Sequence, residues 1–160
     1  MITAAKEDRL APNAAPHPLK AHGILVVDDD TGVRDLLGDW LKQQGYGVWT
    51  AATGQIGIDL YTQHRDAISV VLLDVSMPEL DGPQTLAALR ELDPQVCCFF
   101  MNGKLSSHTE TNLVEMGAKA VIRKPFRLKD IAEPLWTLAA PIQHQTEIQD
   151  DLWRDDGGQG

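Results

Sequence analysis

Five short apolar runs alternate along the chain with longer segments in which apolar residues recur at helical spacing. The runs occupy residues 24–27, 46–52, 69–74, 96–103 and 119–126. Runs of this length, rich in apolar and β-branched residues and bounded by Gly, Pro or Asp, are typical of strands. Strands that alternate with amphipathic segments predict an α/β domain with a parallel sheet, in which helices connect successive strands.

The first two helical segments have recognisable starts, faces and ends. In the first, the apolar residues at positions i, i+3, i+4, i+7 and i+8 are Val33, Leu36, Leu37, Trp40 and Leu41. Gly45 is expected to end this helix. Thr53 is predicted to cap the second helix, which runs to about His64 and turns Ile56 and Leu60 toward the core.

The later helices are predicted from proline, glycine and capping signals. Pro83 stands where a first helical turn tolerates it. The sequence Ser-His-Thr-Glu at 107–110 has the spacing of a capping box for a helix that ends at Gly117. A last helix is expected from about Leu128, although Pro134 removes one of its backbone hydrogen bonds. Its predicted inner face consists of Ile131, Leu135 and Leu138.

Length and composition limit the number of domains. With 160 residues, 43% of them hydrophobic, the chain can build one core of ordinary domain size and not two. Residues 1–22 are rich in Ala and Pro without apolar periodicity, so we expect a flexible leader there. Residues 141–160 are expected to form an acidic, disordered tail. The folded domain is therefore expected at 23–140.

Charge and apolar content exclude two classes of function. The net charge of -9 argues against a nucleic-acid-binding surface, because phosphate contacts need clustered Lys and Arg. No stretch has the apolar length of a signal peptide or a membrane span. Cys97 and Cys98 are adjacent in an apolar run, which suits buried thiols in a reducing compartment. We expect a cytoplasmic protein without membrane insertion.

Polar residues stand at the carboxyl ends of four predicted strands. They are Asp28 and Asp29 after the first, Asp74 after the third, Asn102 after the fourth and Lys124 after the fifth. In an open parallel sheet these ends meet at one edge, where such folds bind their ligands. Three carboxylates repel one another unless a cation compensates, and carboxylate oxygens are ligands that Mg²⁺ prefers.

These residues differ in the role that their position suggests. Asp74, at the centre, is the carboxylate best placed to act as a nucleophile and form an aspartyl phosphate. Lys124 can hold the incoming phosphoryl group, which the carboxylates alone would repel. Asp30 is expected to cap the following helix. Because capping needs only one aspartate, the other two favour a divalent cation or phosphate site.

Three segments carry these residues: ILVVDDD, VVLLDVSMPELDG and RKPF. In this order, at this spacing and on these elements, they resemble the receiver domain of two-component response regulators, over roughly residues 23–140. The resemblance implies a flavodoxin-like, open, doubly wound α/β fold. Its five parallel strands would lie in the order 2-1-3-4-5, flanked by about five helices.

The resemblance also implies a role for each matching position. Asp74 matches the phosphoacceptor and is also a ligand of Mg²⁺. Asp28 and Asp29 match the acidic pair that holds Mg²⁺, and the backbone carbonyl of Ser76 matches a further protein ligand. Lys124 matches the lysine that contacts the phosphoryl group, with a cis peptide bond expected after it.

Three positions depart from the family pattern. Asn102 stands where receivers place Thr or Ser, Gly103 where Ala is preferred, and Val121 where they place an aromatic residue. The Asn102 amide can still donate a hydrogen bond, but it is bulkier than a rotating hydroxyl. Lys104, two residues beyond Asn102, is predicted to reach over the phosphoryl group and slow its loss.

The function that the resemblance implies is that of a stand-alone receiver. It would take a phosphoryl group from a phosphohistidine of a sensor histidine kinase or phosphotransfer protein, with Mg²⁺, and signal by protein contact or phosphorelay. It would be no enzyme beyond its own phosphorylation and dephosphorylation. The alternative is a degenerate receiver that acts as a phosphorylation-independent docking module. A small phosphohydrolase is disfavoured, because Ser76 stands where haloacid-dehalogenase-type phosphatases need an aspartate.

Overall fold

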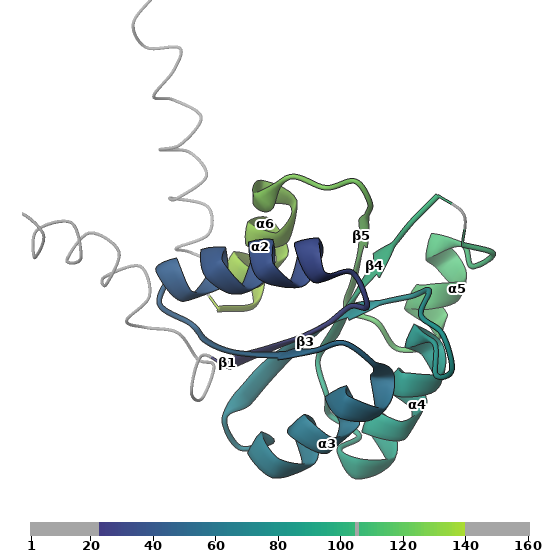
Figure 1. Ribbon diagram of the computed structural model, residues 1–160. Coiled ribbons are helices and arrows are strands. Elements are labelled where there is room, and N and C mark those ends of the chain that lie inside the picture. The colour runs from purple at the N-terminus through teal and green to yellow at the C-terminus, as the bar shows by residue number, and fades with distance from the viewer. Residues whose placement is uncertain (1–22, 105, 140–160) are drawn as a thin grey trace, which may run out of the picture. The chain divides into compact units, whose positions relative to one another are not determined.

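The computed structural model describes residues 23–104 and 106–139 of the chain. Within residues 23–128, five strands form one sheet: β1 (Gly23–Val27), β2 (Gly47–Ala51), β3 (Ile68–Asp74), β4 (Cys98–Asn102) and β5 (Ala120–Arg123). All neighbouring strands are parallel, and their order is β2-β1-β3-β4-β5 (Figure 1). The predicted parallel sheet and its strand order are confirmed.

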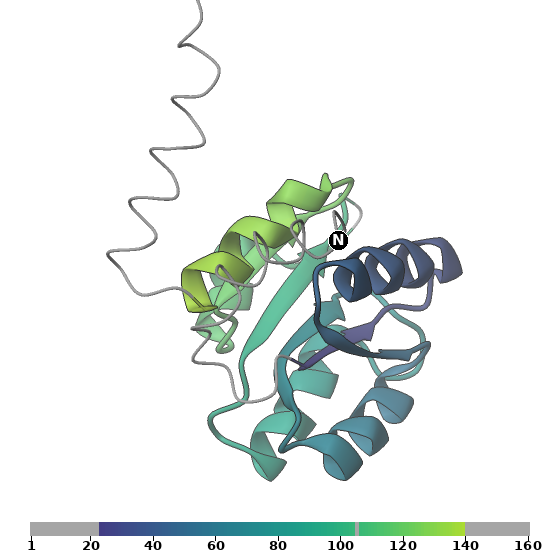
Figure 2. The same ribbon diagram turned by 90° about the vertical axis from the view of Figure 1, so that its left-hand side faces the viewer.

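Four helices connect these strands: α2 (Thr31–Gln43), α3 (Gly54–His64), α4 (Gly82–Leu92) and α5 (Glu110–Glu115). α2 lies on one face of the sheet and α3 on the opposite face, as Figures 1 and 2 both show. α4 lies beside α3, and the Tyr61 hydroxyl of α3 donates a hydrogen bond to Asp93 Oδ2 at the end of α4, 2.7 Å away. Because both faces are covered, all five residues of β1 are buried.

Helix α2 begins and ends as predicted, but one residue of its apolar stripe is exposed. Asp30 is its N-cap, and the carboxylate accepts hydrogen bonds from the backbone N–H groups of Gly32 and Val33. Gly45 follows the helix with a φ of +95°, a conformation that favours glycine. Leu37 and Leu41 are buried, whereas Leu36 is 50% exposed.

Helix α3 has the predicted cap and a different inner face. The Thr53 hydroxyl accepts a hydrogen bond from the Ile56 backbone N–H, 3.1 Å away. Ile56 is 44% exposed, so its predicted position toward the core is wrong. The buried residues are Gly54, Gly57 and Tyr61. Glycine is needed there because a Cβ on Gly57 would lie 2.9 Å from a methyl group of Val27.

Helix α5 begins at a different cap from the one predicted. Thr109 is the N-cap, and Asn112 completes the capping box, so the box predicted at 107–110 is wrong by two residues. The predicted end is confirmed, since Gly117 follows the helix with a φ of +112°.

The last helix, α6 (Leu128–Ala139), is continuous through Pro134. Residues 129–139 belong to a second structural unit and are therefore described by themselves. Ile131 and Leu135 are buried as predicted, and Leu138 is half-buried. No helix in the described part of the chain has the length and apolar character needed to cross a membrane. The leader expected at 1–22 and the tail expected at 141–160 lie outside the described residues.

Candidate functional site

The register of the sheet brings the carboxyl ends of the strands to one edge. Val27, the last residue of β1, lies beside Leu73 of β3, so Asp28 follows β1 where Asp74 ends β3. Asp74 in turn lies beside Met101, and Asn102 beside Arg123. The predicted site residues therefore come from neighbouring strand ends, as a parallel sheet requires.

Three carboxylates converge at this edge. Asp28, Asp29 and Asp74 each offer one oxygen, and these oxygens all lie within 4.8 Å of one another. Asp28 is fully buried and Asp74 is 4% exposed, whereas Asp29 is exposed. Two of the three charges are thus removed from water, which is unfavourable unless positive charge is supplied.

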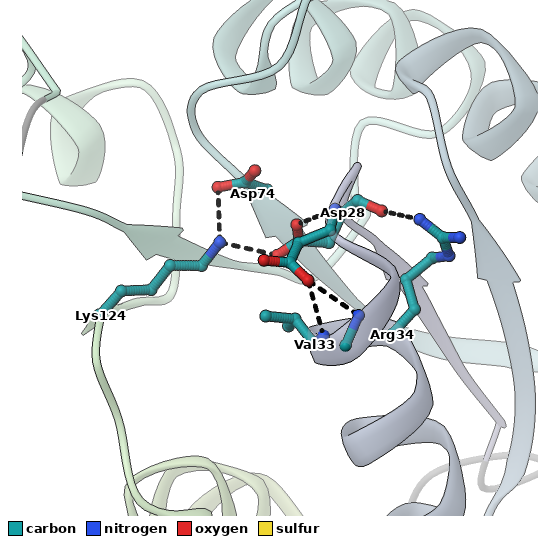
Figure 3. Close-up of polar contacts among 7 residues, drawn as sticks. Asp28, Val33, Arg34, Asp74 and Lys124 are labelled. Atoms are coloured by element: carbon teal, nitrogen blue, oxygen red, sulfur yellow. Dashed lines mark hydrogen bonds and ion pairs between the residues drawn. The ribbon is translucent and has the colours of Figure 1, made fainter.

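Lys124 supplies part of that charge. Its Nζ lies 2.8 Å from Asp28 Oδ2 and 3.1 Å from Asp74 Oδ1, so one ammonium bridges the two buried carboxylates (Figure 3). The peptide bond that follows, Lys124–Pro125, is cis as predicted. The Lys124 backbone N–H also donates to the Asn102 carbonyl at 2.8 Å, which fixes the lysine to the end of β4.

One lysine does not balance three carboxylates. The pKa of Asp74 is raised to about 7, chiefly by burial and then by the Asp28 charge, while Lys124 acts in the opposite direction. For Lys124, burial would lower the pKa, but its hydrogen bonds and charge pairing with Asp28 and Asp74 outweigh burial and raise the pKa. The cluster is therefore an oxygen-rich site with an excess of negative charge, which fits a hard divalent cation such as Mg²⁺.

Hydrogen bonds from the loop between β1 and α2, and from α2 itself, hold Asp28 in place. Its Oδ1 accepts a hydrogen bond from the Asp30 backbone N–H at 2.9 Å, while Asp30 itself caps α2 as predicted. Arg34, which the sequence reasoning did not single out, donates from Nη1 to the Asp28 backbone carbonyl at 2.8 Å (Figure 3). The available signal was a basic residue in the first turn of the helix that follows an acidic run.

Asn102 is at the predicted strand end, but its amide makes a contact that was not predicted. The Nδ2 group donates to the backbone carbonyl of His108 at 3.1 Å, in the segment before α5. Its Oδ1 is buried and has no hydrogen-bond partner among the described residues. The contact found for this amide is thus with the α5 segment rather than with Asp74 or Lys124.

The remaining candidates lie around the cluster. Ser76 is exposed, two residues beyond Asp74. Lys104 is exposed and lines a cavity of about 330 Å³ together with Asn102, Val121 and Lys124. Val121 is half-buried against the core. Lys104 and Lys124 therefore line one cavity.

Comparisons with known proteins agree with this arrangement. The sequence model of the response regulator receiver domain family matches residues 24–135. The chain belongs to this family. It is 33% identical over 112 residues to the sporulation initiation phosphotransferase F of Bacillus subtilis, an alignment that covers 69% of the chain and 87% of that protein. The residues that match the family motifs therefore lie in a domain with the fold of that family.

Other receivers extend the comparison. The chemotaxis protein CheY of Bacillus subtilis is 29% identical, with 72% of the chain and 95% of CheY covered. The response regulator TrrA of Thermotoga maritima, solved in complex with Mg²⁺ and BeF, is 26% identical with a TM-score of 0.64, over 72% of the chain and 97% of TrrA. In longer relatives the match is one part: it spans 12% of the sensor kinase CckA of Brucella abortus.

Family membership defines the general function of the domain. Receivers are signalling modules of two-component systems that accept phosphoryl groups, interact with sensor kinases and phosphotransfer proteins, and bind Mg²⁺ in an acidic pocket. The carboxylate cluster of this receiver supplies the oxygen ligands that such a pocket needs.

Proposed function

We propose that this receiver accepts a phosphoryl group on Asp74 from a phosphohistidine of a sensor histidine kinase or phosphotransfer protein. The observation that carries the proposal is the single ammonium of Lys124, held 3.1 Å from Asp74 Oδ1 and 2.8 Å from Asp28 Oδ2. It places a cation beside the nucleophile without neutralising the whole cluster. The proposed output is contact with another protein or transfer of the phosphoryl group onward.

The chemistry requires an ionised Asp74. A carboxylate oxygen of Asp74 would attack phosphorus, a new P–O bond would form, and the P–N bond to the donor histidine would break with its electron pair remaining on nitrogen. Lys124 would hold a phosphoryl oxygen through a charge-assisted hydrogen bond. Because burial and the Asp28 charge raise the pKa of Asp74 to about 7, added positive charge at the site would favour the reactive form.

The proposed ligands of Mg²⁺ are the carboxylates of Asp28, Asp29 and Asp74 and the backbone carbonyl of Ser76. When bound, the ion would neutralise charge that develops on the transferring phosphoryl group. The spacing of the three carboxylate oxygens, all within 4.8 Å, supports this assignment. We further propose that the protein works in the cytoplasm and catalyses nothing beyond its own phosphorylation and dephosphorylation.

The test is phosphorylation by a small donor. Wild-type protein and the Asp74→Asn variant are incubated with acetyl phosphate, with and without Mg²⁺, and resolved on a phosphate-affinity gel. Of these two proteins, only wild type with Mg²⁺ is expected to give a retarded band. Asp39→Asn, which removes an exposed carboxylate of α2, is the control and should be retarded like wild type. A retarded Asp74→Asn band would place the phosphoryl group elsewhere.

A second candidate is a docking module that works without phosphorylation. The contact between the Asn102 amide and the His108 carbonyl supports it, because this amide is committed to the α5 segment. If neither acetyl phosphate nor a panel of phosphorylated histidine kinases modifies Asp74, this candidate is favoured. Partner binding by Asp74→Asn with wild-type affinity would support it independently.

A further inference from the structure

Arg34 lies next to the acidic cluster and contacts it at the backbone of Asp28. It is the fourth residue of α2 and is half-buried. Nη1 donates to the Asp28 carbonyl at 2.8 Å, and Nη2 lies 3.2 Å from the Thr31 hydroxyl within the same helical turn. Figure 3 shows Arg34 and Lys124 on opposite sides of Asp28.

This contact completes the anchoring of Asp28. The backbone N–H of Asp28 donates to the Ala51 carbonyl of β2 at 3.0 Å, Oδ1 accepts from the Asp30 N–H, and Oδ2 accepts from Lys124. The carbonyl is held by Arg34. Of these four contacts, only that of Arg34 comes from a side chain outside the cluster of carboxylates and its bridging lysine.

The Asp28 carbonyl belongs to the peptide plane that joins Asp28 to Asp29. Rotation of this plane would change the direction in which the Asp29 side chain leaves the backbone. The Asp29 carboxylate is exposed and has no hydrogen-bond partner among the described residues. Its orientation toward the other two carboxylates therefore depends on how well the backbone before it is held.

Arg34 and Lys124 differ in which oxygen atoms of the acidic cluster they occupy. Lys124 binds carboxylate oxygens directly and so shares atoms that a metal ion would need. Arg34 binds a neutral carbonyl, which keeps a positive charge near the cluster while leaving the carboxylate oxygens open. Groups that hold metal ligands without touching the metal commonly affect metal affinity by about 10- to 100-fold.

We propose that Arg34 is a positioning residue for the metal site: it fixes the peptide between Asp28 and Asp29 so that both carboxylates face the same ion. This inference rests on the proposed function, because it concerns the Mg²⁺ that phosphorylation of Asp74 would use.

The test measures Mg²⁺ binding directly. The amide NMR signals of residues 28–30 are followed during Mg²⁺ titration of wild type, Arg34→Met and Arg34→Lys. Arg34→Met keeps the apolar stem and removes the donors and the charge. We expect its dissociation constant to rise about tenfold or more. Arg34→Lys retains one charged donor group, so an intermediate value is expected.

Two further variants separate positioning from charge and from stability. Arg65→Met removes an exposed cation at the end of α3 and should bind Mg²⁺ like wild type. Thr31→Val removes the second contact of the guanidinium and should weaken binding less than Arg34→Met does. Urea unfolding of each variant shows whether the fold is retained. At saturating Mg²⁺, phosphorylation of Arg34→Met by acetyl phosphate should recover toward the wild-type rate.

The outcomes are distinguishable. Binding of Mg²⁺ by Arg34→Met within about twofold of wild type, or an equal loss in Arg65→Met, would overturn the role of Arg34 alone. Absence of any Mg²⁺-dependent shift in the wild-type protein would overturn both this role and the proposed function.

Discussion

Individual residues of the acidic site differ in how firmly their surroundings hold them. Asp28 is bound at its N–H, its carbonyl and both carboxylate oxygens. Asn102, at the end of β4, has a satisfied amide nitrogen but a buried oxygen without a partner among the described residues. An unsatisfied buried acceptor costs about 1 to 3 kcal/mol. The site is thus more fully hydrogen-bonded beside β1 than beside β4.

Lys104 stands on the less fully bonded side. It is exposed and lines the same cavity as Lys124. An ammonium near the phosphoryl group of Asp74 would stabilise its charge, so we predict that Lys104→Ala shortens the lifetime of the aspartyl phosphate. An exposed cation contributes up to about 1 kcal/mol, which corresponds to about fivefold in rate. The lifetime is measured by loss of the retarded band; Lys42→Ala is the control, and an unchanged lifetime would contradict the role.

Glu79, in the loop between β3 and α4, has a backbone conformation that does not suit its residue type. Its φ is +68°, in the left-handed region, and its side chain is exposed. Asn tolerates this region better than Glu. We predict that Glu79→Asn raises the free energy of unfolding by about 0.5 kcal/mol in urea titrations. Alanine has no special tolerance for the left-handed region, so Glu79→Ala should give no such gain in stability. Equal effects of the two substitutions would contradict the explanation.

At the scale of elements, Gly82 determines how closely α4 approaches the end of β3. A Cβ at this position would lie 2.5 Å from the Asp74 carbonyl oxygen and 2.8 Å from Val75 Cα. Because both are backbone atoms, they cannot move without displacing the end of β3. We predict that Gly82→Ala lowers the free energy of unfolding by about 1 to 3 kcal/mol in urea.

Gly103 offers the matched control for this substitution. A Cβ there would meet nothing within 4 Å, so Gly103→Ala should change stability little. Gly82→Ala should also slow phosphorylation by acetyl phosphate, since Asp74 would shift with its carbonyl. Equal stability of the two variants would show that α4 can move away from β3 without lowering the free energy of unfolding.

The elements themselves were predictable because periodicity and strand-end chemistry agree. The apolar runs that end in Asp28 and Asp74 are buried strands, and parallel pairing alone brings those ends together. What periodicity could not give is which side of an apolar stripe meets the sheet. On α3 the close approach to the sheet is made by Gly57, which packs against Val27 of β1, and the larger Ile56 is left exposed.

Contacts between the elements also could not be predicted from the sequence. Residue types and spacing placed Asn102 at the site, but the direction of its amide depends on where the loop before α5 puts the His108 carbonyl. The same holds for α5, whose cap is Thr109 rather than Ser107, since both residues can cap and only the path of the loop selects one. Arg34 was missed because its partner is a backbone carbonyl, which no side-chain motif reveals.

At the scale of the whole molecule, the excess of acidic charge at the site links its ionisation to folding. The pKa of Asp74 is raised to about 7 from an ordinary value of 3.8, chiefly by burial and then by Asp28. Between these two pH values the folded state binds more protons than the unfolded state. This group therefore makes the protein less stable as pH rises through that window, and its ionised form is the one that a bound cation would stabilise.

We predict that Asp74→Asn, which cannot ionise, becomes more stable relative to wild type as pH rises from 5 to 8 without Mg²⁺. The difference in the free energy of unfolding should grow by more than about 1.4 kcal/mol, the equivalent of one pKa unit. Urea unfolding at several pH values with EDTA measures it, and Asp39→Asn controls for the loss of one carboxylate elsewhere. Excess Mg²⁺ should reduce the difference at pH 8, because the ion binds the folded wild-type site and adds stability there. A difference that is independent of both pH and Mg²⁺ would mean that the Asp74 carboxylate is already fully compensated by Lys124 in the folded protein.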